Sequence, residues 1–307
     1  MQTTIKGQVV FSGRGLHSGK AVKMVVKPAA AHHGIWFSRL DIKAADRLVP
    51  ATWDAVVPAS LCTKLENGDG VTVSTVEHLM AALAGCGIHN VLIELDGPEV
   101  PIMDGSAIPF VKRFLQRGLR KLEAPITAFQ VIHPVTVTQA GATASLEPAA
   151  TLEIDFEIDF VDPAIGRQQK TLAMNNGSFV RELSDSRTFC RRVDVETMQA
   201  NGLALGGRSG ENAVVFDGTK VISPGGLRHK DEPVRHKMLD ALGDLALAGA
   251  PLLGRYRGHL AGHALTNALL RKLFGTPGAV RVVECDAALA STLPGYGLVL
   301  DEIPRVA

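Results

Sequence analysis

Three side chains with metal-binding chemistry recur at helical spacing in residues 231–244. His236, Asp240 and Asp244 stand four residues apart, so on a helix they form one stripe that drifts by about 40° per step. A histidine and an aspartate one turn apart can both reach one metal ion. The alternative is a solvated helix face, which is the commoner origin of an isolated His-x-x-x-Asp pair.

A second candidate pair lies in residues 74–83. Glu77 and His78 are adjacent, so on a helix their side chains diverge by about 100°. One of them can bind a metal ion while the other reaches over the water bound to it. Ser74 and Glu77 also match the Ser-x-x-Glu pattern of a capping box, and that alternative makes Glu77 a structural cap.

Two further histidines, His259 and His263, stand four residues apart among glycines. They can form a second ligand pair, or one of them can sit at a loop-to-helix junction as a proton donor. A structural histidine is the default for either residue taken alone. The patterns HExxH, GxGxxG, GxxxxGK[ST] and GxSxG are absent from the sequence. Residue spacing alone is therefore consistent with a His/Asp metal hydrolase and does not specify its substrate.

The segments that must position these residues predict an α+β fold. Apolar residues flank a glycine-rich bend at 13–19, which predicts a hairpin, and 67–70 (Asn-Gly-Asp-Gly) predicts a second turn. Apolar and acidic residues alternate over 152–160, which predicts an antiparallel strand with one solvated face. A buried strand is expected at 91–95, and helices at 74–84, 109–117, 178–183, 231–248 and 262–274. Asp231 is expected to cap the helix that carries His236. Each half runs strands first and helices later, which favours α+β layers over a doubly wound parallel sheet.

Composition narrows the possible functions. The chain has 307 residues, 46% of them hydrophobic, and its formal charge of +1 argues against a broad nucleic-acid surface. The N-terminus lacks the apolar run of a signal peptide, and the apolar stretch 245–253 is far shorter than the roughly 20 residues that span a bilayer. We therefore expect a cytoplasmic protein that does not span the membrane. The four cysteines are scattered with no CxxC pair, so nitrogen and oxygen atoms must hold any metal.

Six segments taken together carry a resemblance to a known family. In chain order they are residues 15–19 (GLHSG), 76–83 (VEHLMAAL), 100–106 (VPIMDGS), 187–189 (RTF), 234–244 (VRHKMLDALGD) and 262–265 (GHAL). They follow the order of the UDP-3-O-acyl-N-acetylglucosamine deacetylase family, zinc enzymes of lipid A synthesis, and the chain closely resembles that family over nearly its whole length. The resemblance implies two similar α+β domains, at 1–122 and 126–300, with helix layers packed between two mainly antiparallel sheets. Residues 120–125 are the candidate linker, and residues of about 190–216 resemble the insert that walls an acyl passage.

The resemblance also implies roles for individual residues. It implies that the zinc ligands are His78, His236 and Asp240, and that the general base is Glu77. His263 matches the charged histidine that protonates the leaving amine, and Asp244 matches the acid that orients it. Thr188 matches the hydroxyl that polarises the carbonyl. Three further residues match substrate-binding positions: Lys237, Phe189 and Phe160. Three protein ligands leave one zinc position open for water.

The family expectation extends to cofactor and partners. We expect Zn²⁺, with Fe²⁺ able to replace it, an acylated UDP-sugar as substrate, no nucleic acid, and a monomer. Departures from the family pattern at Asp162, His229, Pro233 and the stretch 206–212 leave acyl-chain length and nucleotide contacts open. The alternatives are a metal amidohydrolase with another acylated substrate, and a nucleotide-sugar or RNA-binding module on an α+β fold like that of ribosomal proteins.

Overall fold

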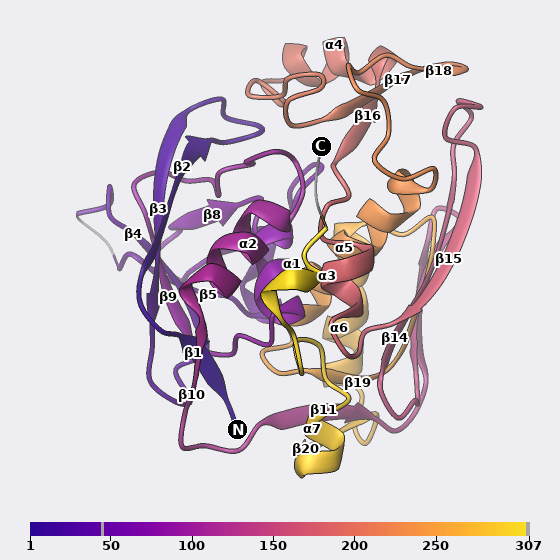
Figure 1. The fold of residues 1–307 in the computed structure, drawn as a ribbon. Coiled ribbons are helices and arrows are strands. Elements are labelled where there is room, and N and C mark those ends of the chain that lie inside the picture. The colour runs from indigo at the N-terminus through magenta and orange to yellow at the C-terminus, as the bar shows by residue number, and fades with distance from the viewer. Residues whose placement is uncertain (44–45, 305–307) are drawn as a thin grey trace.

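The computed structural model describes residues 1–43 and 46–304, and within them it is an α+β protein. Figure 1 shows a central layer of helices with a five-stranded sheet on one side and a seven-stranded sheet on the other. The described residues also form three smaller sheets, of two, three and three strands. The predicted α+β class is therefore confirmed, with these small sheets as additions to the two large ones.

The five-stranded sheet is built from the first part of the chain, in the order β2-β3-β9-β4-β5. Its strands are β2 (Val9–Arg14), β3 (Ala21–Pro28), β9 (Val91–Leu95), β4 (Ile35–Arg39) and β5 (Leu48–Pro50). The pair β4–β9 is parallel, and the other pairs are antiparallel. The predicted hairpin is β2–β3, and the predicted buried strand is β9 at the centre of the sheet.

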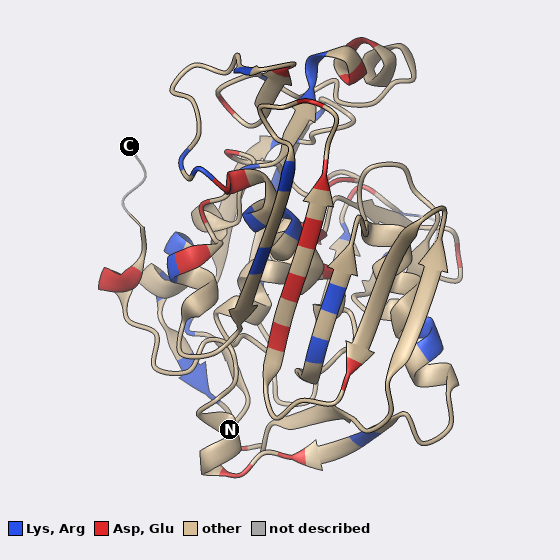
Figure 2. Cartoon of the chain, turned by 90° about the vertical axis from the view of Figure 1, so that its right-hand side faces the viewer, with Lys and Arg blue, Asp and Glu red and all other residues tan. Residues whose placement is uncertain are grey.

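The seven-stranded sheet is built from the rest of the chain. Its strands are β11 (Thr127–Val131), β12 (Val135–Gln139), β13 (Ala142–Glu147), β14 (Leu152–Asp159), β15 (Arg167–Ala173), β19 (Leu252–His259) and β20 (Val280–Glu284). Strand β14 buries its apolar residues and turns its acids outward, as predicted. Figure 2 shows this acidic row between basic residues of β15 and β19. However, β14 is antiparallel only to β15 and runs parallel to β19, so its predicted antiparallel character is half correct.

Five helices fill the space between the two large sheets: α1 (Glu77–Gly85), α2 (Ile108–Arg117), α3 (Ser178–Glu182), α5 (Glu232–Ala246) and α6 (His263–Gly275). All five coincide with predicted helices. Helix α5 packs against α1, and Gly243 permits the approach, because a Cβ there would lie 2.0 Å from the carbonyl oxygen of Glu77. Most of α5 is buried, including His236, Asp240 and Asp244, so their stripe is not a solvated face.

Two predicted helix starts differ from the structure. Ser74 ends strand β8 (Thr72–Ser74), and α1 begins only after Thr75, whose φ is +58°. Val76 is the N-cap of α1 with no side-chain hydrogen bond, so the capping-box alternative is wrong. Asp231 does occupy the N-cap position of α5, but its carboxylate accepts from Arg235 at 2.6 Å and does not cap the helix. A positive charge one turn away is the stronger partner for that carboxylate.

The remaining elements connect and extend the two sheets. The predicted turn 67–70 joins β7 (Lys64–Glu66) to β8, and β6 (Val56–Val57) completes their sheet. Strand β1 (Thr3–Ile5) pairs with β10 (Leu119–Lys121), so Arg120 and Lys121 belong to a strand and the predicted linker starts too early.

A protruding segment at the top of Figure 1 contains β16 (Phe189–Arg191), α4 (Arg192–Ala200), β17 (Val214–Asp217) and β18 (Lys220–Val221). Short helical turns lie at η1 (Trp53–Ala55), α7 (Ala287–Ala290) and η2 (Leu300–Glu302). In the part of the chain that the structure describes, no helix has both the length and the hydrophobicity needed to cross a bilayer.

Candidate metal centre and active site

Three buried side chains from two helices bring their ligand atoms together. His78 lies on α1, and His236 and Asp240 lie one turn apart on α5. The Nε2 atoms of both histidines are 3.4 Å from Oδ1 of Asp240, and the three ligand atoms all lie within 4.8 Å of one another. Tetrahedral zinc bonds of about 2.1 Å place neighbouring ligand atoms roughly 3.4 Å apart. The spacing therefore fits a single small metal ion.

The protonation of this group also fits a cation. Oδ1 of Asp240 is buried and has no hydrogen-bond partner among the residues that the structure describes. Burial opposes its ionisation, but the ammonium of Lys237 helps to hold the pKa of Asp240 well below its usual value. Burial lowers the pKa of His236 to about 4, so its imidazole is neutral. A neutral imidazole and an unpaired carboxylate oxygen are the ligand forms that a metal requires.

His236 is oriented by the backbone behind it. Its Nδ1 donates to the carbonyl oxygen of Ser186 at 3.0 Å, because a carbonyl can only accept. The proton of the neutral ring is thereby held on Nδ1, and the lone pair of Nε2 faces the metal centre.

Glu77 lies beside the ligand group, at the first position of α1. Its Oε2 accepts from the backbone N–H of Thr63 at 3.1 Å, and its Oε1 is 3.9 Å from Nε2 of His263. Burial raises the pKa of Glu77, although the nearby His263 and His78 partly oppose that rise. A buried carboxylate with a raised pKa, next to a metal centre, is suited to act as a general base.

His263 begins α6 and is paired with an acid on α5. Its Nδ1 is 2.8 Å from Oδ2 of Asp244, and its Nε2 is 4.0 Å from Oδ2 of Asp240. Burial alone would lower its pKa, but the carboxylates of Asp244 and Glu77 outweigh burial and raise the pKa of His263 to about 9. The imidazole is therefore a cation at neutral pH and can donate a proton.

Thr63 is a site residue that the sequence did not indicate. Its backbone N–H donates to Glu77, and its hydroxyl donates to Oδ1 of Asp244 at 2.6 Å. It thus links the two carboxylates that flank His263. A lone threonine in a loop carries no signal of this kind, so sequence reasoning could not have singled it out.

The two histidines of the 259–263 pair lie in different surroundings. His259 ends β19, is half-exposed, and has its Nδ1 3.6 Å from Oε2 of Glu157 on the neighbouring strand. His263 faces Asp244 and the metal ligands. The structure therefore separates the two histidines, and only His263, at the junction of a loop with α6, lies at the candidate site.

A cavity of about 1050 Å³ opens over these groups. Its walls include Thr188, Lys237, Phe160 and Phe189 together with Glu77, His78, His236, Asp240 and His263. The rings of Phe160 and Phe189 meet edge to face at 5.5 Å, and Phe189 lies 6.2 Å from the ring of His236. Residues of α4 line the same cavity. The cavity has an apolar, aromatic wall, and the charged side chains of the metal centre form its floor. Such a space suits a ligand with an apolar chain and a polar head.

Lys237 lines the cavity and also contacts a member of the ligand group. Its Nζ donates to Oδ2 of Asp240 at 2.7 Å. The ammonium is thus placed to influence both the metal centre and any anionic group in the cavity.

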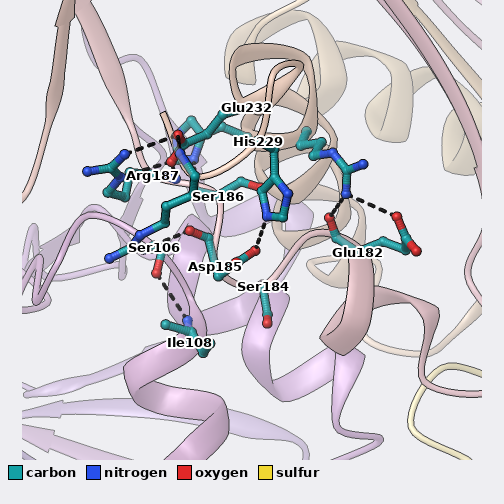
Figure 3. Close-up of polar contacts among 12 residues, drawn as sticks. Ser106, Ile108, Glu182, Ser184, Asp185, Ser186, Arg187, His229 and Glu232 are labelled. Atoms are coloured by element: carbon teal, nitrogen blue, oxygen red, sulfur yellow. Dashed lines mark hydrogen bonds and ion pairs between the residues drawn. The ribbon is translucent and has the colours of Figure 1, made fainter. Parts of the chain in front are cut away.

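The residues that depart from the family pattern make contacts with their local surroundings. Oδ1 of Asp162 accepts from the backbone of Gly218 at 3.1 Å, at the base of the protruding segment. His229 pairs with Asp185 at 2.8 Å, in the polar cluster of Figure 3. Pro233 is buried in the first turn of α5, where its missing N–H is tolerated.

The arrangement defines a class of protein: an α+β metal-dependent hydrolase, whose three candidate ligands leave room for a water next to the buried carboxylate of Glu77 and the cationic imidazole of His263. Sequence comparison places it more closely. The sequence model described as UDP-3-O-acyl N-acetylglycosamine deacetylase matches residues 2–275, and the chain belongs to this family.

Curated relatives cover nearly the same length. A protein named UDP-3-O-acyl-N-acetylglucosamine deacetylase from Phenylobacterium zucineum is 48% identical over 281 residues, which is 92% of this chain and 96% of the relative. Proteins of the same name from Shewanella pealeana and Shewanella oneidensis are each 43% identical; the matches cover 95% and 96% of this chain and 97% of each relative.

Proposed function

We propose that this chain hydrolyses the N-acetyl group of UDP-3-O-(3-hydroxyacyl)-N-acetylglucosamine and releases acetate, the committed step of lipid A synthesis. Family membership and the names of the relatives support the substrate. The observation that carries the chemistry is the position of Glu77 and His263, 3.9 Å apart beside the three ligand atoms. Amide hydrolysis needs a base for the attacking water and an acid for the leaving amine, and we assign these roles to Glu77 and His263.

His78, His236 and Asp240 would hold the metal, which we propose to be Zn²⁺, with Fe²⁺ able to replace it. When bound, such an ion acts as a Lewis acid toward the amide carbonyl and the attacking water. The residues supply the proton transfers. Glu77 takes a proton as a C–O bond forms at the acetamide carbon. His263, kept cationic by Asp244, gives a proton to the amide nitrogen as the C–N bond breaks, so acetate and a free amine leave.

Thr188 and the cavity wall complete the proposed mechanism. We assign the Thr188 hydroxyl a hydrogen bond to the carbonyl oxygen, where negative charge develops. Phe160 and Phe189 are proposed to contact the substrate, and Lys237 to meet an anionic part of it. Because Lys237 also touches Asp240, replacing it by Ala should raise KM and weaken metal binding together. Phe160→Ala should raise KM with the metal content unchanged.

The proposed function also includes a division into domains and a role for the protruding segment. We propose domains at 1–122 and 126–300, because the strands of the five-stranded sheet all precede residue 96 and those of the seven-stranded sheet all follow residue 126. We propose that residues 190–216 wall the acyl chain, since α4 and its neighbours line the cavity. A cytoplasmic location and a monomeric state remain predictions.

Acetate release by the purified protein tests the proposal, measured with and without a chelator. We expect turnover that a chelator abolishes and added zinc restores. His236→Ala should lose both metal and turnover, because one of three ligands is gone. A protein that binds the metal but releases no acetate from this nucleotide sugar would indicate another acylated amide as substrate. A protein that binds the nucleotide sugar without hydrolysing it would be a binding module.

A further inference from the structure

The loop between α3 and β16 is held by one buried carboxylate. Glu232, the first residue of α5, is 1% exposed and accepts four hydrogen bonds. Three come from Arg187, through its backbone N at 3.0 Å, Nε at 2.9 Å and Nη2 at 3.1 Å. The fourth comes from the backbone N of Arg228 at 2.7 Å. Figure 3 shows Glu232 and Arg187 facing each other across this loop.

The residues on either side of Arg187 both belong to the candidate site. Ser186 presents its carbonyl oxygen to Nδ1 of His236 at 3.0 Å. Thr188 lines the cavity, and its backbone N–H donates to Gly105 at 2.8 Å. A backbone shift at Arg187 therefore moves the carbonyl that orients His236 and the proposed oxyanion hydroxyl at the same time.

We propose that Glu232 is a positioning residue of the metal centre, which acts through Arg187 to hold the Ser186 carbonyl on Nδ1 of His236. This proposal rests on the proposed function only in taking His236 as a metal ligand. Glu232 and His236 lie on one helix, one turn apart, so the ligand and the group that anchors its orienting carbonyl share a rigid element. The Arg187–Glu232 pair thus ties the loop to the helix that carries two of the three ligand atoms.

The chemistry of the pair makes it sensitive to small changes. Both side chains are buried, and burial of a charge without its partner is strongly unfavourable. In Glu232→Gln the amide oxygen can still accept, but the amide NH₂ would face donors of Arg187 or Arg228. In Arg187→Lys the charge and the backbone N–H remain, but the side chain loses its two-pronged contact with the carboxylate.

The chain offers a matched control in a second ion pair to α5. Glu182, the last residue of α3, pairs with Arg235 of α5 at 3.0 Å, but its side chain is 42% exposed. Among the described residues, no hydrogen bond or ion pair joins Glu182 or Arg235 to Ser186. Figure 3 shows Glu182 to one side of the cluster. Glu182→Gln removes a charge from the same region without touching the loop that orients His236.

Metal affinity and the tautomer of His236 test the proposal. Zinc affinity is measured by competition with a chelator. The tautomer is read from the long-range ¹⁵N–¹H spectrum of the metal-free protein, with the His236 signals assigned by comparison with His236→Ala. We expect Glu232→Gln to bind zinc roughly 10- to 100-fold more weakly, the usual effect of losing an outer-shell partner. The Nδ1–H tautomer of His236 should give way to a mixture. Arg187→Lys should show a smaller loss in the same direction, and Glu182→Gln should match the wild type.

Two outcomes would overturn the proposal. The first is a folded Glu232→Gln with wild-type zinc affinity and an intact His236 Nδ1–H signal, even at a lowered Tm, because Glu232 would then stabilise the fold only. The second is additivity of Glu232→Gln and Arg187→Lys in the double variant, which would mean that Glu232 does not act through Arg187. If Glu232→Gln does not fold, Arg187→Lys alone decides, and wild-type affinity in that variant overturns the proposal. These measurements need no substrate, so a wild-type protein that releases no acetate would count against the proposed function and leave this test intact.

Discussion

Replacing Glu77 by Gln separates a catalytic role from a structural one. The carboxylate makes one protein hydrogen bond, from the backbone N–H of Thr63 at 3.1 Å, and the amide oxygen of Gln can accept it equally well. The side-chain volume barely changes, and Glu77 does not cap α1. We therefore expect the Tm and the bound metal to stay close to those of the wild type.

The turnover number, in contrast, should fall strongly. A positioned general base contributes about 10²- to 10⁴-fold, which corresponds to about 3 to 5 kcal/mol of activation free energy. A second effect follows from charge. The Glu77 carboxylate helps to raise the pKa of His263 to about 9, so a neutral Gln lowers that pKa. The wild type should be active between the raised pKa of Glu77 and about pH 9, because the base must be deprotonated and the acid protonated. The variant should lose the acidic limb of this profile, and its alkaline limb should move to lower pH.

Acetate release measured across pH, together with metal content and Tm, tests this prediction. Glu94→Gln is a matched control, because Glu94 lies on β9 and pairs with Lys27, away from the cavity. A Glu77→Gln protein that keeps its metal and turns over near the wild-type rate would refute the base assignment. An unchanged alkaline limb would refute the electrostatic coupling to His263.

Two further variants probe the same helices. Asp244→Asn should shift the alkaline limb to lower pH, because the Asp244 carboxylate is the main group that raises the pKa of His263; an unmoved limb in the pH–rate profile would contradict this. Gly243→Ala should separate α1 from α5, since its Cβ would lie 2.0 Å from the carbonyl oxygen of Glu77. We expect it to cost about 1 to 3 kcal/mol of unfolding free energy and to reduce metal binding. Gly275→Ala is its control, with nothing within 4 Å of the added carbon. Equal Tm values for the two alanine variants would contradict the close-approach argument.

The sequence predicted those elements whose signal is local. Helix α5 was recognisable because its apolar and polar residues follow the helical period, and the same period predicted that His236 and Asp240 lie one turn apart. Strand β14 was recognisable from its alternation. Its parallel neighbour β19 was not, because strand direction depends on a residue pairing about 100 positions away, such as Leu152 with Gly254.

The site itself could be assembled only in part. Spacing alone favoured Glu77 as a helix cap over a base. The facts that exclude the cap are the +58° φ of Thr75 and the hydrogen bond from Thr63, which no local pattern encodes. Thr63 meets Asp244 across 181 positions of the chain. The resemblance to a family assigned residues from distant segments to one site. Spacing could not do this, because the fold brings those segments together only through long-range contacts.

The buried charges of this centre explain why the fold leaves one carboxylate oxygen of the ligand group without a partner. Ionised groups inside a protein are unfavourable unless they are paired. Asp244 has His263 and Thr63, Glu232 has Arg187, and Oδ2 of Asp240 has Lys237. Among the described residues, Oδ1 of Asp240 is the buried carboxylate oxygen that lacks such a partner, and it faces two imidazole nitrogens at 3.4 Å. The surrounding pairs hold the neighbouring carboxylates in place, so the free energy left unsatisfied at this atom becomes available for binding a cation.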